Sequence, residues 1–81
     1  MFEYYICNMA DDDIFRRQCV AIERNITPLS KEKLLEDVDG TLIQIYDYAG
    51  NTIEVCSDHV TDEVYVKSEL ELKQFFDITG Q

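Results

Sequence analysis

Two aspartates and the one histidine of the chain are the residues whose types and spacing could perform acid and base chemistry. Asp37 and Asp39 are separated by one residue, and His59 follows Asp58 directly. Paired carboxylates and an imidazole can move protons to and from a substrate, and the same groups can hold a metal ion. A histidine in a polar connection is more commonly a solvated turn residue. These residues support a small carboxylate-dependent hydrolase only as the least favoured of three functional hypotheses.

The letters around the two aspartates match a known catalytic motif. Asp37-Val38-Asp39-Gly40-Thr41-Leu42 resembles the first motif of the haloacid-dehalogenase-like phosphatases. The resemblance implies a nucleophilic Asp37, an acid/base Asp39 and a nearby magnesium ion. In that family the motif follows an apolar strand of a longer doubly wound fold, whereas residues 31–36 here are charged. We therefore expect no phosphatase activity, because a helix end followed by a turn explains the same letters.

Metal and cofactor motifs fail at their diagnostic positions. A calcium loop starting at Asp37 would need glycine at its sixth position and glutamate at its twelfth, where Leu42 and Tyr48 stand. Cys7, Cys19 and Cys56 form no C-x-x-C pair, so zinc is not supported. We expect no cofactor and no metal.

The negative charge is concentrated in one half of the chain. The net charge is -10, from 17 acidic and 7 basic residues. Residues 1–34 contain six acids and five bases, whereas residues 35–81 contain eleven acids and only Lys67 and Lys73 as bases. A field of one sign attracts cationic partners and repels nucleic acid and anionic lipid. The charge predicts a basic protein surface as partner, and neither nucleic acid nor membrane.

Length and composition bound the class of protein. Eighty-one residues with 46% hydrophobic content predict a single folded domain over 1–81. No apolar stretch approaches the roughly 20 residues of a membrane span. The first residues lack the basic and apolar regions of a secretory signal, and three widely spaced cysteines fit a reducing compartment. We expect a cytoplasmic protein.

Hydrophobic periodicity predicts an α+β fold with a small antiparallel sheet, in the order β-α-α-β-β-β-α. Residues 2–7 predict a strand, 11–25 the longest helix, 31–37 a short second helix, and 68 onward a last helix containing Leu72, Phe75 and Phe76. Residues 41–48, 52–57 and 62–67 predict a three-stranded meander. Asp39-Gly40 is also a hairpin signal, which leaves open a strand over 33–38 paired with 41–46.

Alternation along the predicted strands assigns residues to the two faces of the sheet. The helices are expected to cover one face, formed by Ile6, Ile43, Ile45, Ile53, Val55, Val64 and Val66. The opposite face then carries Tyr5, Leu42, Tyr46, Tyr48 and Tyr65 among Gln44, Glu54 and Glu63. Tyrosine is enriched at protein interfaces because it combines an apolar ring with a polar tip. The predicted partner-binding residues are Tyr46, Tyr48, Glu54, Asp62, Glu63 and Tyr65.

These features favour a non-catalytic acidic protein-interaction module, of the inhibitor or immunity type, that binds a basic protein surface. Such a protein would use complementary charge to speed encounter and tyrosines to form the packed centre of the interface. The alternative from a different class is a structural homodimer whose aromatic sheet faces meet around a two-fold axis. The small hydrolase is third.

Overall fold

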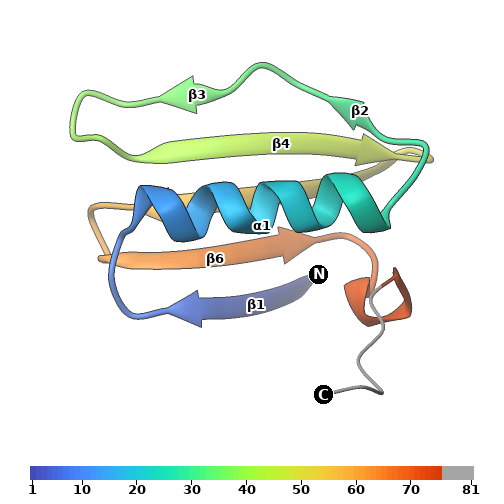
Figure 1. Ribbon diagram of the computed structural model, residues 1–81, viewed down its shortest axis with the longest axis horizontal. Helices are drawn as coiled ribbons and strands as arrows, with labels where there is room; N and C mark the ends of the chain where they lie inside the picture. Colours follow the sequence, from blue (N-terminus) through green and yellow to red (C-terminus); the bar gives the residue numbers. More distant parts are fainter. Residues whose placement is uncertain (76–81) are drawn as a thin grey trace.

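One α-helix lies across one face of an antiparallel sheet in the computed structural model, which describes residues 1–75 (Figure 1). The sheet has six strands in the order β1-β6-β5-β4-β2, and β3 also pairs with β4. The elements are β1 (Phe2–Cys7), α1 (Asp12–Asn25), β2 (Ser30–Lys31), β3 (Leu35–Glu36), β4 (Leu42–Tyr48), β5 (Asn51–Asp58), β6 (Glu63–Ser68) and the 3-10 helix η1 (Leu72–Phe75). The α+β class and the predicted meander are confirmed.

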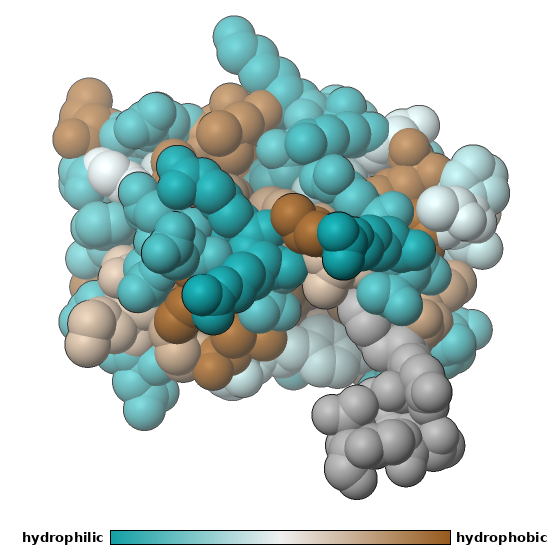
Figure 2. Space-filling model, in the orientation of Figure 1, coloured by the Kyte–Doolittle hydropathy of each residue, from teal (hydrophilic) through white to brown (hydrophobic). Residues whose placement is uncertain are grey.

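Helix α1 begins and ends where its sequence directs. The Asp11 carboxylate accepts a hydrogen bond from the Ile14 amide at 3.0 Å, which caps the N-terminus. Acids occupy the first turn and Arg24 the last, as the helix dipole favours. The buried stripe of the helix is Phe15, Cys19 and Ile22, while the side that faces the viewer in Figure 2 is mostly hydrophilic.

The predicted helix over residues 31–37 is wrong, and the hairpin alternative describes the segment better. The Gly40 amide donates to the Asp37 carbonyl at 3.1 Å, and the Asp37 amide donates to the Thr41 carbonyl at 2.9 Å. Gly40 has a φ of 93°, which glycine adopts at little cost. The Asp39-Gly40 turn therefore folds β3 back onto β4, and the order β-α-α-β-β-β-α is not observed.

The predicted last helix is reduced to a single 3-10 turn within the described residues. The Ser68 hydroxyl donates to the Leu70 carbonyl at 2.6 Å and accepts from the Leu70 amide at 3.1 Å, so Ser68 forms a local turn rather than capping an α-helix. The Leu72 amide donates to the Tyr4 hydroxyl at 2.9 Å and ties η1 to β1. Leu72 and Phe75 pack against the core as expected, and Phe76 lies outside the described residues.

The core lies between α1 and the face of the sheet that it covers. Strand pairing places Tyr46 beside Ile53, Gln44 beside Val55 and Val55 beside Val66 on this face. The core residues are Phe15, Cys19, Ile22, Ile26, Leu42, Tyr46, Ile53, Val55, Val66 and Leu72.

The predicted faces of β4 are exchanged in the structure. Tyr46 is fully buried beneath α1, and its hydroxyl donates to the Glu23 carboxylate at 2.5 Å. Gln44 is buried as well, with its amide donating to the Glu32 carbonyl at 2.6 Å. The isoleucines at 43 and 45 lie on the other face with Asp47, because alternation places all three together. Burying a hydrogen-bonded amide or hydroxyl costs less free energy than burying an unpaired carboxylate such as that of Asp47.

Within residues 1–75, no helix is long and apolar enough to cross a membrane.

Candidate functional site

The face of the sheet opposite α1 has no helix packed on it in the described chain, and we call it the open face. Both α1 and η1 contribute their buried residues to the core on the other side. Directly paired residues form an apolar row across the open face: Leu35 faces Ile43, Ile43 faces Cys56, Cys56 faces Tyr65 and Tyr65 faces Tyr5. Leu35 and Tyr5 at the two ends are 48% and 65% exposed. The row therefore presents apolar surface at both edges of the sheet.

Carboxylates surround this apolar row. Strand pairing puts five acids on the open face with one base: Glu3, Asp47, Glu54, Asp58, Glu63 and Lys67. Lys67 pairs with both Glu54 and Glu3 across its two neighbouring strands. The strands of the open face thus combine an apolar row with an excess of negative charge.

A shallow hollow of about 150 Å³ lies on the part of the open face that β1, β5 and β6 form, and we call it the open-face hollow. Its lining consists of Glu3, Tyr5, Asp58, Thr61, Glu63, Tyr65 and Lys67. The Tyr5 and Tyr65 rings are 6.3 Å apart at a tilt of 58°. The ammonium of Lys67 lies 5.2 Å from the centre of the Tyr65 ring, within the distance at which a cation is attracted to an aromatic face.

Hydrogen bonds hold the tyrosines and carboxylates of the hollow in place. The Tyr65 hydroxyl donates to Asp58 at 3.2 Å, and the Tyr5 hydroxyl donates to Glu3 at 3.4 Å. Partial burial opposes ionisation of Asp58, yet donation from the Val60 and Thr61 amides and from Tyr65 keeps its pKa below the ordinary value. Burial is the main cause that raises the pKa of Tyr65. At neutral pH the hollow therefore presents an ionised Asp58 and a neutral Tyr65.

Such a lining suits the guanidinium group of arginine. Guanidinium is planar, stacks on aromatic rings and donates to carboxylates in a fixed geometry.

Cys56, at the centre of the apolar row, is only 1% exposed, and burial raises the pKa of its thiol. Cys56 therefore serves as packing rather than as a nucleophile.

The structure brings together only part of the predicted partner-binding set. Glu54, Glu63 and Tyr65 share the open face. Asp62 lies in the loop between β5 and β6, where its carboxylate accepts from the Ala10 amide at 2.9 Å. The placement of Tyr46 on the open face is wrong, since its ring is buried under α1.

Tyr48 was also expected on the open face and instead lies on the covered side. Its ring meets Phe75 edge to face at 5.1 Å. Tyr5 lies on the open face as predicted but is not in the predicted binding set, and neither are Glu3, Ile43, Ile45 and Asp58, which the structure also places there. Asp47 could have revealed this, because alternation puts Asp47 on the same face as Ile43 and Ile45, and a charged residue indicates a face that is exposed to water.

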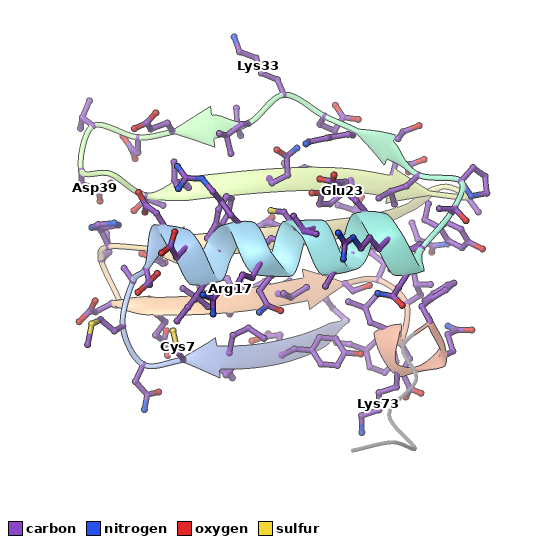
Figure 3. All side chains as sticks on the ribbon, in the orientation of Figure 1. Cys7, Arg17, Glu23, Lys33, Asp39 and Lys73 are labelled. Atoms are coloured by element: carbon purple, nitrogen blue, oxygen red, sulfur yellow. The ribbon has the colours of Figure 1, made fainter. Side chains whose placement is uncertain are left out.

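The aspartates of the motif-like segment stabilise a turn. The Asp39 carboxylate accepts from the Thr41 amide at 2.9 Å, which is the main cause that lowers its pKa. The Asp37 carboxylate accepts from the Val38 amide at 2.7 Å. His59 lies over Gly40, where an added Cβ would stand 3.3 Å from the imidazole ring. Asp37, Asp39 and His59 are all exposed, and Asp39 lies at the end of the molecule in Figure 3.

Within residues 1–75, no three metal-ligating side chains lie close enough together to hold a metal ion. Comparison with protein-family models, with curated proteins and with solved structures gives no match.

Proposed function

We propose that this protein is a non-catalytic acidic interaction module whose open face binds a basic surface of another protein. In this proposal an arginine of the partner enters the open-face hollow, and the apolar row packs against the surface beside it. The single observation that carries the proposal is the pairing of two tyrosine rings with Glu3, Asp58 and Glu63 in one hollow. An inhibitor or immunity-type role, in which the module covers a cationic site of its partner, fits this chemistry.

Three further features support the proposal. The hydroxyls of Tyr5 and Tyr65 are already hydrogen-bonded, so the rings lose little freedom when a partner binds. The Lys67 ammonium over Tyr65 indicates that the hollow accommodates a cation. Cys7, Cys19 and Cys56 are free thiols, which fits the reducing cytoplasm that we propose as the location.

The direct test uses a blocked tripeptide with a central arginine and its citrulline counterpart, which keeps the shape and loses the charge. Both are titrated into isotopically labelled protein and followed by NMR. We expect weak binding of the arginine peptide, with shifts confined to Tyr5, Tyr65 and their neighbours, and weakening as salt screens the carboxylates. Equal binding of the citrulline peptide, or shifts that centre on Asp11–Asp13, would contradict the proposal.

A matched pair of variants separates the open face from general acidity. Glu63→Gln removes one carboxylate from the hollow, and Asp12→Asn removes one from the exposed start of α1. Both change the net charge by the same amount. We expect Glu63→Gln to weaken arginine-peptide binding several-fold and Asp12→Asn to leave it almost unchanged. An equal loss in the two variants would mean that the peptide responds to net charge alone.

A further inference from the structure

The two edges of the sheet differ in how well they are protected against pairing with another strand. Strands β2 and β3 are two residues long each, and the segment between them carries Lys33, whose side chain points away from the sheet in Figure 3. Short strands and lysines of this kind protect an edge. Strand β1 has six residues and contains no proline and no lysine, with Glu3 as its only charged side chain. The β1 edge therefore lacks these two devices, and the irregularity between Tyr5 and Cys7 interrupts it only near its end.

Apolar side chains gather beside the β1 edge on the helix side. Phe2 and Ile6 are 42% and 37% exposed. A groove of about 240 Å³ runs between α1 and β1, lined by Tyr4, Ile6, Gln18, Ile22, Leu72 and Lys73 among its residues. The register shift between Tyr5 and Cys7 leaves Ile6 on the groove side with Tyr4. Phe2, Tyr4 and Ile6 thus form an apolar strip along the edge of β1 that pairs with no other strand within residues 1–75.

We propose that β1 pairs antiparallel with β1 of a second copy of this chain, around a two-fold axis that passes beside Tyr4. In this register Tyr4 lies opposite Tyr4 of the second copy, and Phe2 lies opposite Ile6 of the second copy at the rim of the groove. Glu3 lies opposite Tyr5 of the second copy on the open face, where the hydroxyl can donate to the carboxylate. These three pairings match side chains of suitable chemistry, and the Phe2–Ile6 and Glu3–Tyr5 contacts each occur twice about the axis, as a two-fold interface requires.

One of the two neighbouring registers, with the axis beside Glu3, is disfavoured by charge. A shift of one residue in the axis position would place Glu3 directly opposite Glu3 of the second copy, and like charges in that arrangement destabilise a strand pair. The overall charge of -10 opposes any self-association. Residues 1–34, which supply β1 and α1, contain six acids and five bases, so the repulsion is weakest where the copies meet. Added salt should therefore strengthen the dimer.

This inference goes beyond the proposed function, and the two share only Glu3 and Tyr5 among the residues of the open-face hollow. Phe2 and Ile6 lie on the helix side of β1, so substituting them leaves the lining of the open-face hollow intact. The two interactions also depend on salt in opposite ways, because salt weakens arginine binding and favours pairing of two acidic copies. Either interaction can therefore fail without the other.

Sedimentation velocity over a range of protein concentrations tests the dimer with exposed apolar residues replaced by lysine. Phe2→Lys and Ile6→Lys place a charge on the proposed strand pair, and Val60→Lys makes the same charge change at a loop residue that is 82% exposed. We expect a dimer in the wild type and in Val60→Lys, and a monomer in the two β1 variants. Circular dichroism checks that all variants fold. A monomeric wild type at both low and high salt, or equal loss of the dimer in Val60→Lys, would overturn the proposal.

Cross-linking tests the register. In a Cys7→Ser background, Phe2→Cys and Ile6→Cys chains are mixed and oxidised. The proposed register brings these two positions together only between chains, so a disulfide-linked heterodimer should form in the mixture. Equal cross-linking of Phe2→Cys chains with one another would contradict this register.

Discussion

The covered and open faces belong to the same strands, yet they handle polar and apolar groups in different ways. On the covered face, Ile53, Val55 and Val64 are wholly buried, and the polar groups of Gln44 and Tyr46 have hydrogen-bond partners. On the open face Cys56 is buried, but the other apolar side chains, such as Ile43 and Ile45, stay partly in water among carboxylates. The single α-helix packs on one face of the sheet, and no helix packs on the other face within residues 1–75.

The difference between the faces indicates where the stability of the domain resides. Burial of apolar area stabilises a small domain, and almost all of the complete burial is on the covered side. The open face contributes less to folding, so its residues are freer to serve a partner. If this division is correct, matched substitutions on the two faces should have unequal effects on the free energy of unfolding.

The largest difference is expected between Ile53→Ala and Ile45→Ala. Ile53 is fully buried on the covered face, and Ile45 is half-buried on the open face of the neighbouring strand. Ile53→Ala leaves a cavity and should lower the free energy of unfolding by about 2–5 kcal/mol. Ile45→Ala should lower it by only about 1 kcal/mol, because water already reaches this side chain.

Urea denaturation at neutral pH measures both variants against the wild type. Similar dependence of the unfolding free energy on urea concentration would show that the substitutions change stability and not the compactness of the denatured state. Equal losses in the two isoleucine variants would break the distinction between the faces.

The next largest difference is expected when a tyrosine hydroxyl is removed. Tyr46→Phe deletes the hydrogen bond to Glu23 and should cost about 1–2 kcal/mol. Tyr65→Phe deletes a 3.2 Å hydrogen bond to Asp58 near solvent and should cost less than about 0.5 kcal/mol. The same denaturation experiment measures both, and a larger loss in Tyr65→Phe would contradict the assignment of the core.

The pH dependence of stability gives Tyr46 a distinct signature. Burial, followed by the bond to Glu23, raises the pKa of Tyr46 above its ordinary value of 10. Above that pH the unfolded chain releases a proton that the folded chain keeps, so stability falls by up to about 1.4 kcal/mol per pH unit. Tyr46→Phe loses the part of this dependence that comes from Tyr46 and keeps the part from Tyr65, so its stability should fall less steeply than that of the wild type and converge with it as the pH rises above 10. A parallel decline in both proteins would exclude Tyr46 as the cause.

The elements with strong local signals were predictable from the sequence. Helix α1 has an Asp11 cap and a regular apolar stripe, and it was predicted almost to its bounds. The strands of the meander were dense in β-branched and aromatic residues, with Ala49-Gly50-Asn51 between the first two as a turn. In these segments the local preference and the tertiary structure agree.

Two predicted helices were wrong, the first because the local Asp39-Gly40 hairpin prevailed over helix propensity, and the second because of long-range contacts. Residues 31–37 have helix-forming side chains, but the Asp39-Gly40 turn pairs them with β4. The residues after Ser68 were predicted as an α-helix. They form a 3-10 turn instead, in which the Leu72 amide donates to the Tyr4 hydroxyl and Phe75 packs on Tyr48. Neither contact can be inferred from neighbours in the sequence.

Only residues of the candidate site that lie on β5 and β6 were predicted, because the two faces of β4 are difficult to tell apart from sequence. Strand β4 alternates between two faces that are both apolar, and the isoleucines at 43 and 45 made the wrong one resemble the core. The Tyr46 and Gln44 side chains can be buried because Glu23 and the Glu32 carbonyl accept their hydrogen bonds. Glu63 and Tyr65 on β6 were assigned correctly, since only valines alternate with them before Ser68.

The turn between β4 and β5 fixes the register of those strands, and therefore which of their residues share a face, and it gives the smallest predicted effect. Tyr48 pairs with Asn51, and the two residues between them both have positive φ, 51° at Ala49 and 85° at Gly50. This is the geometry of a type I′ hairpin, which favours Asn-Gly. An alanine in the left-handed region is strained by about 1–2 kcal/mol, and asparagine relieves part of this strain.

Ala49→Asn should therefore raise the free energy of unfolding by about 0.5–1 kcal/mol without changing the register. Gly50→Ala is the opposing control: a Cβ at Gly50 meets nothing within 4 Å, so any loss of stability there comes from the backbone conformation alone. We expect Gly50→Ala to lower stability by about 1 kcal/mol. Because this turn sets the alternation of both strands, NMR contacts between Tyr46 and α1 should be the same in all three proteins. Loss of those contacts in Ala49→Asn would mean that packing under α1, rather than the turn, selects the covered face of β4.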